Sequence, residues 1–430
     1  MKPFRFILRS LRHYRRAHLS VAAGAAVATM VLAGALLVGD SVRGSLRRQA
    51  IARLGETQLA LSPPVRMVRE ALAEELEREL GVPVAPVLEL DGTVETAEGK
   101  SFAPKARILG VDEGFWRLGR ASPTDRLTSG RGMINEELAR RLGISPADEP
   151  VRVVLRVVKP GPLSREVPLT SDEADTAMAA VEVRVAGDKH FGRFDLRANQ
   201  APPRNLFVPL GWLQKLAGLA EDASEPHARA NVLLVGGAGS KPISPARASG
   251  ALRRSWRLAD AEAELVAQPD EGPPKALVLR SRRVFLEDAL ADAAVEVDKP
   301  ALGVLTYLVT KTTGDRNVSA YPAVAALGRP RGGGPVAGDP VWSVLPEDMG
   351  RDEIILNEIM ARELDAKPGD SVRLHYLLAE GRGLANKTSP SLAVRGIRPM
   401  DEGIDAELMR SLAPIIPGLS GQRSCRDWRL

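Results

Sequence analysis

The chain has 430 residues, of which 44% are hydrophobic and 26% are charged. This composition is typical of two or three globular domains, and it excludes collagen-like, coiled-coil and low-complexity proteins. The single cysteine, Cys425, excludes an intramolecular disulfide and a cysteine-based metal site. The net charge of +5 is concentrated in residues 1–18, a basic arm without acidic residues. Because the rest of the chain is close to neutral, we expect no nucleic-acid partner.

The most informative segment is 19–38, which contains no charged residue. At about 1.5 Å per residue, a helix of this length spans the roughly 30 Å hydrocarbon core of a bilayer. We therefore predict a transmembrane helix, with a lipid bilayer as its partner. The basic arm favours a cytoplasmic N-terminus, with the chain from about Asp40 onward outside. The alternatives are a cleaved signal peptide, whose apolar core is usually only about 7–15 residues long, and a buried core helix, which the preceding arginines disfavour.

Residues 39–56 continue the helical pattern beyond the predicted span. They contain no proline, and Val42, Leu46 and Ala50 recur at helical spacing. We therefore expect a stalk helix that joins the membrane helix to the rest of the chain. Alanine and glycine crowd the predicted span, and small residues let membrane helices approach closely, so we also expect a partner helix. No second long apolar run follows, which predicts a single-pass protein.

The sequence after the stalk contains short strand and helix patterns. We predict a strand over 58–61, a helix over 63–80, and strands over 84–90 and 106–111 around a turn region at Asp91 and Gly92. One face of the helix would be apolar, and it consists of Val65, Val68, Leu72, Leu76 and Leu80.

The same pattern recurs in the second half of the chain. Residues 59–61 match 277–279 at a separation of 218, and 134–136 match 356–358 at a separation of 222. Chance similarity is the alternative, because alanine, leucine and arginine are abundant, but the constant order of the matches favours duplication. We therefore predict an α+β fold with two duplicated α/β units, at 57–160 and 275–430.

The matched blocks contain two asparagines with the same predicted role. Asn135 and Asn357 each precede a glutamate and a helical pattern, so each is expected to cap a helix N-terminus. We therefore regard these residues as structural and not catalytic.

Residues 161–274 differ from both units, and we predict that they form a β-richer inserted subdomain. We expect a loop over 160–180, strands over 181–185 and 231–235, and a helix over 245–265. A glycine-rich loop is expected over 329–338, within the second unit.

Motifs for catalysis and for cofactor binding are absent from the sequence. No GxxxxGK[ST] loop and no GxSxG sequence is present, and the five histidines form no HExxH pattern. Carboxylate pairs such as Glu74 and Glu75 fall on predicted helices, where charged residues usually form solvated faces. We therefore expect no catalytic, cofactor-binding or metal-binding residue, no cofactor, and no enzyme activity in this chain.

Several phrases of the sequence resemble a known family. They are GDSVRGSLRR from Gly39, GVDEGFWRLG from Gly110, NLFVPLGWLQKLAGL from Asn205, NVLLV from Asn231 and LNEIMARELDAKPGDSVRL from Leu356. With the basic arm and the single span, they make the chain similar to the N-terminal part of an FtsX-like, MacB-type ABC transporter permease. The resemblance implies a location in the cell inner membrane and a MacB-like periplasmic core domain, in which two small α/β subdomains flank an insertion.

The resemblance also implies partners and a function. In such transporters a separate ABC ATPase subunit hydrolyses ATP, and the permease transmits that cycle to the periplasmic domain during substrate export. Family members carry three further spanning helices after the periplasmic core, so we expect a truncated permease here. Otherwise a second permease chain or other permease helices would supply them in a homo- or hetero-oligomer. The alternatives are a membrane-tethered periplasmic scaffold protein without an ATPase partner, and an anchored hydrolase of unrecognised type.

Overall fold

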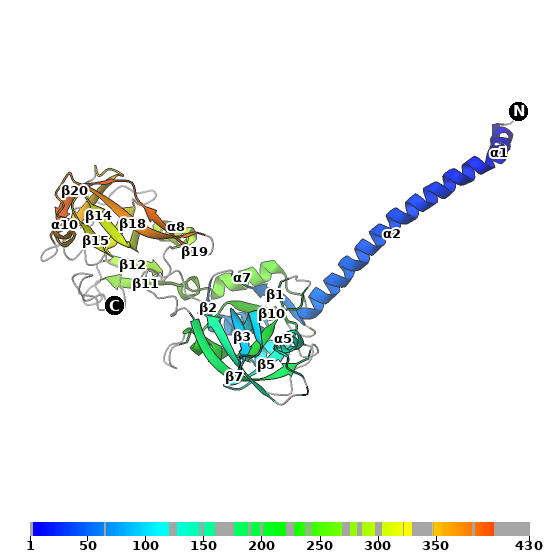
Figure 1. Cartoon of the computed structure of the whole chain (residues 1–430), viewed down its shortest axis with the longest axis horizontal. Coiled ribbons are helices and arrows are strands. Elements are labelled where there is room, and N and C mark those ends of the chain that lie inside the picture. The colour runs from blue at the N-terminus through cyan, green and yellow to red at the C-terminus, as the bar shows by residue number, and fades with distance from the viewer. Residues whose placement is uncertain are drawn as a thin grey trace. The chain divides into compact units, whose positions relative to one another are not determined.

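The computed structural model describes residues 3–63, 66–119, 127–145, 147, 150–159, 176–187, 191–197, 201–220, 228–236, 239, 242–268, 276–281, 286–296, 303–320, 322–328, 346, 348–380 and 383–399. Figure 1 shows their helices and strands. The chain divides into two compact units. Unit 1 comprises Met1–Ser62, Ala73–Val157 and Met178–Ala251, and unit 2 comprises Pro63–Leu72, Val158–Ala177 and Leu252–Leu430. The predicted glycine-rich loop over 329–338 lies outside the described residues, as does most of the predicted loop over 160–180.

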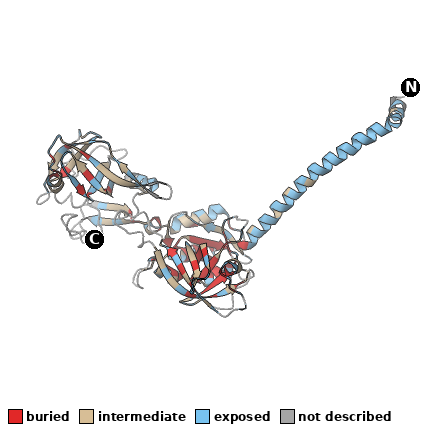
Figure 2. Ribbon diagram, in the orientation of Figure 1, coloured by how far each residue is buried: buried red, intermediate tan, exposed pale blue. Residues whose placement is uncertain are grey.

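Two helices begin unit 1. α1 (Pro3–His13) is followed, after Tyr14, by α2 (Arg15–Arg53), which has 39 residues. α2 contains the predicted span 19–38 and most of the predicted stalk, so the prediction of one continuous helix is confirmed. An 18-residue window of α2 has a mean hydropathy of 2.3 and none of it is buried, as Figure 2 shows. In the described part of the chain, α2 is the one helix long and apolar enough to cross a membrane.

An eight-stranded sheet forms the body of unit 1. Its order is β1-β10-β3-β4-β8-β5-β7-β6, and β3 also pairs with β6, which closes the strands from β3 to β6 in this order into a ring. The strands are β1 (Thr57–Leu61), β3 (Val84–Thr96), β4 (Phe102–Val111), β5 (Arg131–Asn135), β6 (Val151–Val158), β7 (Thr176–Ala186), β8 (Asn205–Pro209) and β10 (Val232–Gly236). The short strand β9 (Arg229–Ala230) precedes β10.

Strand β3 is longer than the predicted strand over 84–90. It pairs with β4 through most of its length and with β6 from Gly92 to Thr96. Gly92, which we expected in a turn, lies inside this strand. A Cβ atom at Gly92 would lie 2.5 Å from the carbonyl oxygen of Arg156. The glycine therefore lets β6 approach β3 closely enough to close the ring, a common role for a glycine in a strand.

Unit 1 includes strands that we expected in a separate subdomain over 161–274. β7, β8 and β10 lie in the same sheet as β3, and residues 178–251 belong to unit 1. β10 is buried throughout and β8 nearly so. Strands that are buried on both faces are stable inside a sheet that other elements cover, and not in an exposed insertion. The predicted boundary at 160 therefore does not separate two sheets.

The helix that we predicted over 63–80 begins later, as α3 (Ala71–Leu80). Residues before it form the short strand β2 (Val68–Arg69). The reason is a tertiary contact in unit 2, in which the backbone N–H and the Nε of Arg69 each donate to Oδ1 of Asp260 at 3.0 Å. Of the predicted apolar face, Val68, Leu72, Leu76 and Leu80 are buried, and Val65 lies outside the described residues.

The predicted helix over 245–265 is also shorter in the structure. α7 (Pro245–Ser255) is followed by the 3-10 turn η4 (Leu258–Ala261) and then by β11 (Ala263–Gln268). Asp260 accepts a hydrogen bond from the backbone N–H of Arg257 at 3.0 Å. This side-chain cap stabilises a tight turn in place of further helix.

The described residues of unit 2 form a six-stranded sheet and two strand pairs. The strand order in the sheet is β15-β14-β18-β20-β17, and β19 pairs with β18. The two strand pairs are β11 with β12 and β13 with β16. The remaining elements of unit 2 are β12 (Ala276–Ser281), α8 (Asp288–Glu296), β13 (Gly303–Leu308), β14 (Lys311–Gly314), β15 (Val318–Ala320), β16 (Ala323–Gly328), β17 (Glu353–Asn357), α10 (Glu358–Leu364), β18 (Ser371–Glu380), β19 (Gly383–Thr388) and β20 (Leu392–Arg398).

The two units share one local arrangement. In unit 1, α5 (Glu136–Leu142) follows β5, and β5 pairs in parallel with β7, which lies between β5 and β6. In unit 2, α10 follows β17, and β17 pairs in parallel with β20, which lies between β17 and β18. The order strand, helix, strand therefore recurs where the sequence blocks match. The duplication of whole units stays a prediction.

Candidate functional site

The exposed apolar surface of α2 is the first candidate for a functional surface. Its large apolar side chains are mostly exposed, and among them Met30 is 72% and Leu36 71% exposed. They point in all directions around the helix, because the segment 19–38 has no polar face. A helix that is apolar all round is stable when it is buried in a protein or in lipid, and no described residue buries the apolar window of α2. Its surface therefore suits the interior of a bilayer.

The junction between α2 and the sheet is the second candidate feature. Gly55 follows the end of α2 with a φ of +59°, which is the left-handed region. A Cβ atom at this position would overlap the carbonyl oxygen of Leu118. The backbone N–H of Glu56 donates to that same oxygen at 2.8 Å, and β1 begins at the next residue. The chain therefore passes from helix to sheet through a tight connection fixed to the end of α4 (Glu113–Leu118).

An aromatic cluster lies beneath this junction. The ring centroid of Phe115 is 4.8 Å from that of Phe191 and 5.2 Å from that of Phe194. Trp116 is 5.3 Å from Phe207, which comes from β8. All five rings are buried in the core of unit 1. Aromatic pairs at these distances add to the stabilisation by area burial, so they hold α4 firmly on the sheet.

Asp112 caps the N-terminus of α4. Its Oδ1 accepts a hydrogen bond from the backbone N–H of Phe115 at 2.9 Å. Burial raises the pKa of the Asp112 carboxyl above its ordinary value, although the hydrogen bond from Phe115 and the charge of Arg117 act in the opposite direction. The pKa shift therefore has a structural cause, which is the desolvation of a capping carboxylate.

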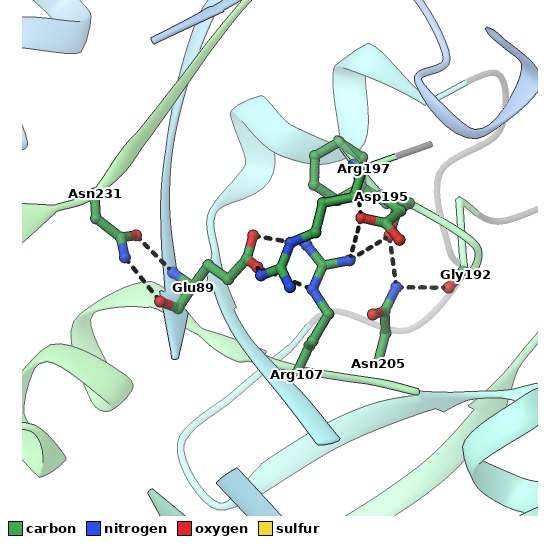
Figure 3. Close-up of polar contacts among 8 residues, drawn as sticks. Glu89, Arg107, Gly192, Asp195, Arg197, Asn205 and Asn231 are labelled. Carbon is green, nitrogen blue, oxygen red and sulfur yellow. Dashed lines mark hydrogen bonds and ion pairs between the residues drawn. The ribbon is translucent and has the colours of Figure 1, made fainter. Parts of the chain in front are cut away.

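A largely buried polar cluster adjoins the aromatic cluster at Phe194, whose carbonyl oxygen accepts from Arg107 and Asn205, and Figure 3 shows it. Arg107 on β4 donates to Glu89 on β3, with Nη2 to Oε2 at 2.6 Å and Nε to Oε1 at 2.9 Å. Its Nη1 lies 2.9 Å from Oδ1 of Asp195. The exposed Arg197 reaches the same Glu89 at 2.9 Å. The half-buried Glu89 and the buried Asp195 thus share Arg107, and Glu89 also pairs with Arg197.

Two asparagines extend the cluster to the neighbouring strands. Asn231, directly before β10, forms two hydrogen bonds with the backbone of Glu89, both at 2.8 Å. Asn205 on β8 donates to the carbonyl oxygens of Gly192 and Phe194 at 3.1 and 2.8 Å. The cluster therefore ties β3, β4, β8 and β10 to residues 192–197 (Figure 3). Because each ionised group has a partner, the arrangement is typical of a structural network and not of a reaction centre.

The sequence did not lead us to this cluster. Its members come from distant positions, and no motif joins them. One signal was available, because Arg107 lies inside the apolar run of β4 and a charged residue in a buried strand requires a partner.

The residues predicted to be structural have that role. Oδ1 of Asn135 accepts from the backbone N–H of Leu138 at 3.0 Å, and Oδ1 of Asn357 accepts from that of Met360 at 2.7 Å, so both predicted N-caps are confirmed. Among the described residues, no group of three or more histidines, cysteines or carboxylates could hold a metal ion. The prediction that the chain has no catalytic, cofactor-binding or metal-binding residue stays a prediction.

Comparisons with known proteins give little further information. No family model matches the sequence, and no curated protein matches it. Among solved structures, the chain is similar to the crystal structure of the periplasmic region of MacB from Actinobacillus actinomycetemcomitans. The identity is 12% and the TM-score is 0.30, over 58% of this chain and 97% of that chain. The likeness of fold is loose.

Proposed function

We propose that this chain is a membrane-anchored permease component of an ABC transporter of the MacB/FtsX type. Its N-terminus would lie in the cytoplasm, α2 would cross the cell inner membrane, and the chain from about Asp40 onward would lie on the outer side. A separate ABC ATPase subunit would supply the chemistry, and this chain would transmit the ATPase cycle to the extracytoplasmic side during substrate export. Sequence phrases such as the one from Leu356 support this assignment, because they resemble that family.

The observation that carries the proposal is the continuity of α2. The helix runs from Arg15 to Arg53 without a break, and it is followed by the tight connection at Gly55. At about 1.5 Å per residue, the part after Gly39 reaches roughly 20 Å beyond the membrane segment. A helix of this kind resists bending, because bending breaks backbone hydrogen bonds. Movement of the span would therefore reach the sheet of unit 1 through the Leu118 carbonyl instead of being lost in a flexible linker.

Interrupting the stalk tests this coupling. Gln49→Pro removes a hydrogen bond inside α2 at an exposed position, at a cost of about 3 kcal/mol or more to the helix. Gln49→Ala at the same site keeps the helix and serves as the control. We expect the ATPase subunit in proteoliposomes to lose its stimulation by substrate with the proline variant and to keep it with the alanine variant. Equal stimulation by both variants would exclude mechanical coupling through α2.

Topology provides an independent test. Reporter fusions before Leu19 should report the cytoplasm, and fusions after Asp40 should report the extracytoplasmic side. The opposite result would overturn the orientation. Recovery of the mature chain in the soluble fraction, trimmed near Gly39, would show a cleaved signal peptide.

The second candidate is a membrane-tethered scaffold protein without an ATPase partner. Every ionised group in the buried polar cluster has a partner, so the cluster is structural. A structural cluster of this kind fits a scaffold protein as well as a transporter component. Neighbouring genes for an ABC ATPase and for a three-helix membrane segment would favour the permease. The absence of both genes would favour the scaffold.

We also propose that the two units arose by duplication. The shared order of β5-α5-β6-β7 and β17-α10-β18-β20 supports this relation. An experimental structure in which residues 57–153 and 275–374 cannot be superimposed through α5 and α10 would contradict it.

A further inference from the structure

The helix α1, before the apolar segment, has two chemically different faces. Phe4, Ile7, Leu8 and Leu11 follow the spacing i, i+3, i+4, i+7, which places them on one face of a helix with 3.6 residues per turn. Arg9 and Arg12 lie on the other side at the same periodicity. No acidic residue occurs in α1. The helix is therefore amphipathic, and every charged residue on its other face, which also carries Phe6 and Ser10, is basic.

The apolar face of α1 is uncovered. Phe4 is 69% exposed and Leu11, the least exposed of the four, is 48% exposed. In water, four large apolar side chains in one contiguous stripe are unfavourable, and such stripes mark binding surfaces. The four residues are too few to span a bilayer, since the whole of α1 has 11 residues.

The chain bends between α1 and α2. Tyr14 is non-helical with φ −96° and ψ 21°, and its side chain does not cap α2. The helical hydrogen-bond pattern nevertheless continues across this bend. The N–H of Tyr14 donates to the carbonyl oxygen of Ser10, and the N–H of His18 donates to that of Tyr14, both at 3.0 Å. Only residues 14–18 separate α1 from the apolar segment that begins at Leu19. If that segment lies in the bilayer, α1 must lie at the level of the lipid headgroups.

We infer that α1 lies in the plane of the membrane and binds anionic lipid headgroups, a partner beyond those of the proposed transporter. The apolar face enters the headgroup and acyl boundary, and Arg9, Arg12 and the neighbouring Arg16 meet the phosphates. The charge of α1 favours a lipid surface over a protein as its binding partner. A polar face with arginines and no acidic residues matches a surface that is negative throughout, as anionic headgroups are. The inference rests on the membrane anchoring proposed for α2.

The test uses the full chain with Cys425→Ser, in nanodiscs of phosphatidylcholine with or without phosphatidylglycerol. A spin label is placed at Leu8→Cys, on the apolar face, or at His13→Cys, on the opposite side of the helix. Collision with oxygen reports lipid, and collision with a water-soluble nickel chelate reports water. With phosphatidylglycerol, we expect the Leu8 label to collide mainly with oxygen and the His13 label mainly with nickel. Without it, the Leu8 label should move toward the aqueous pattern.

Charge reversal supplies the matched comparison. R9E/R12E should make the label at Leu8 aqueous even with phosphatidylglycerol present. R47E/R48E, which reverses two exposed charges on the stalk, should leave the label in lipid. An aqueous Leu8 label in every disc, the same depth with and without anionic lipid, or protection from both colliders, as against a protein, would each overturn the inference while α2 remains inserted. A chain that fails to copurify with the discs would overturn the anchoring and the inference together.

Discussion

The same strand, helix and strand occur in both units, but in different surroundings. In unit 1, the segment β5-α5-β6 belongs to a closed ring, and the capping residue Asn135 is 1% exposed. In unit 2, the segment β17-α10-β18 belongs to a sheet whose described strands do not close into a ring. The buried core beside that segment is much smaller. The comparison shows that local sequence determines the capped helix, whereas the tertiary contacts around it determine how much each residue stabilises the fold.

The strand β8 accounts for much of the difference. It lies between β4 and β5 in unit 1 and carries Asn205 and Phe207, which contribute to the polar cluster and to the aromatic cluster. Among the residues that the structure describes in unit 2, no strand occupies the corresponding place beside β17. Three pairs of substitutions and one single substitution can break or sharpen this comparison, and all can be measured by urea unfolding of the purified chain in detergent, followed by tryptophan fluorescence.

The largest effect is expected for Arg107→Met. This change leaves the buried carboxylate of Asp195 without Arg107 and leaves Glu89 with the exposed Arg197 alone, which should cost about 3–5 kcal/mol of unfolding free energy. Arg316→Met is the control in unit 2, where Arg316 is 47% exposed and pairs with Asp370 at 2.9 Å. That loss should be at most about 1 kcal/mol. Similar losses for the two arginines would show that the polar cluster is not a network of buried charges.

The next effect concerns the two N-caps. Asn135→Ala removes the cap and also leaves the carbonyl of Pro203 and the N–H of Asn205 without their partner, so we expect a loss of about 2–3 kcal/mol. Asn357→Ala should cost only about 1 kcal/mol, because we find the cap to be its main hydrogen bond. Equal losses of unfolding free energy in the two variants would show that burial of the capping residue does not add to its contribution to stability.

An exchange of the two C-caps should give a smaller effect with opposite signs. α5 ends at Gly143 with φ 71°, and α10 ends at Asp365 with φ 49°. Gly143→Asp places a side chain in the left-handed region and should cost about 1 kcal/mol, whereas Asp365→Gly relieves that strain and should stabilise unit 2 by up to about 1 kcal/mol. Destabilisation by Asp365→Gly would show that its ion pair with Arg316 outweighs the strain.

The smallest effect is expected for Asp112→Asn, which keeps the cap of α4 and removes its charge. Because burial raises the pKa of this carboxyl in the folded state, the ionised form destabilises the fold at pH values above that raised pKa. The variant should therefore be more stable than the native chain at neutral pH. The advantage should disappear below the ordinary pKa of 3.8, where the carboxyl is protonated in both states. A pH-independent difference would contradict this assignment.

Features that depend on neighbouring residues could be predicted from the sequence. The caps at Asn135 and Asn357 follow from a residue and the helical pattern after it, and α2 follows from composition alone. The start of α3 could not be predicted in this way, because it depends on Asp260, which is 191 residues away from Arg69. The assignment of β8 and β10 to the first sheet also depends on pairing between distant strands.

The polar cluster was missed for the same reason. Glu89, Arg107 and Asp195 are separated by many residues, and only the closed sheet brings them together. Periodicity identifies which residues of a strand are buried, but it does not show which strands are neighbours. Of the candidate sites, the apolar surface of α2 could be predicted, while the junction at Gly55 and the cluster at Arg107 could not.

The position of β10 in the sheet has a consequence for the order of folding. Among the described strands, β1 pairs with β10 alone, and β10 in turn pairs with β3. Residues 57–61 are synthesised early, yet they have no neighbouring strand until residues 232–236 have followed them. The first strand after α2 must therefore wait without this partner through the synthesis of most of unit 1. Pairing over such a distance along the chain is slow, and an unpaired strand edge is prone to aggregation, so the period before β10 is made is the one in which β1 is most exposed to misassembly.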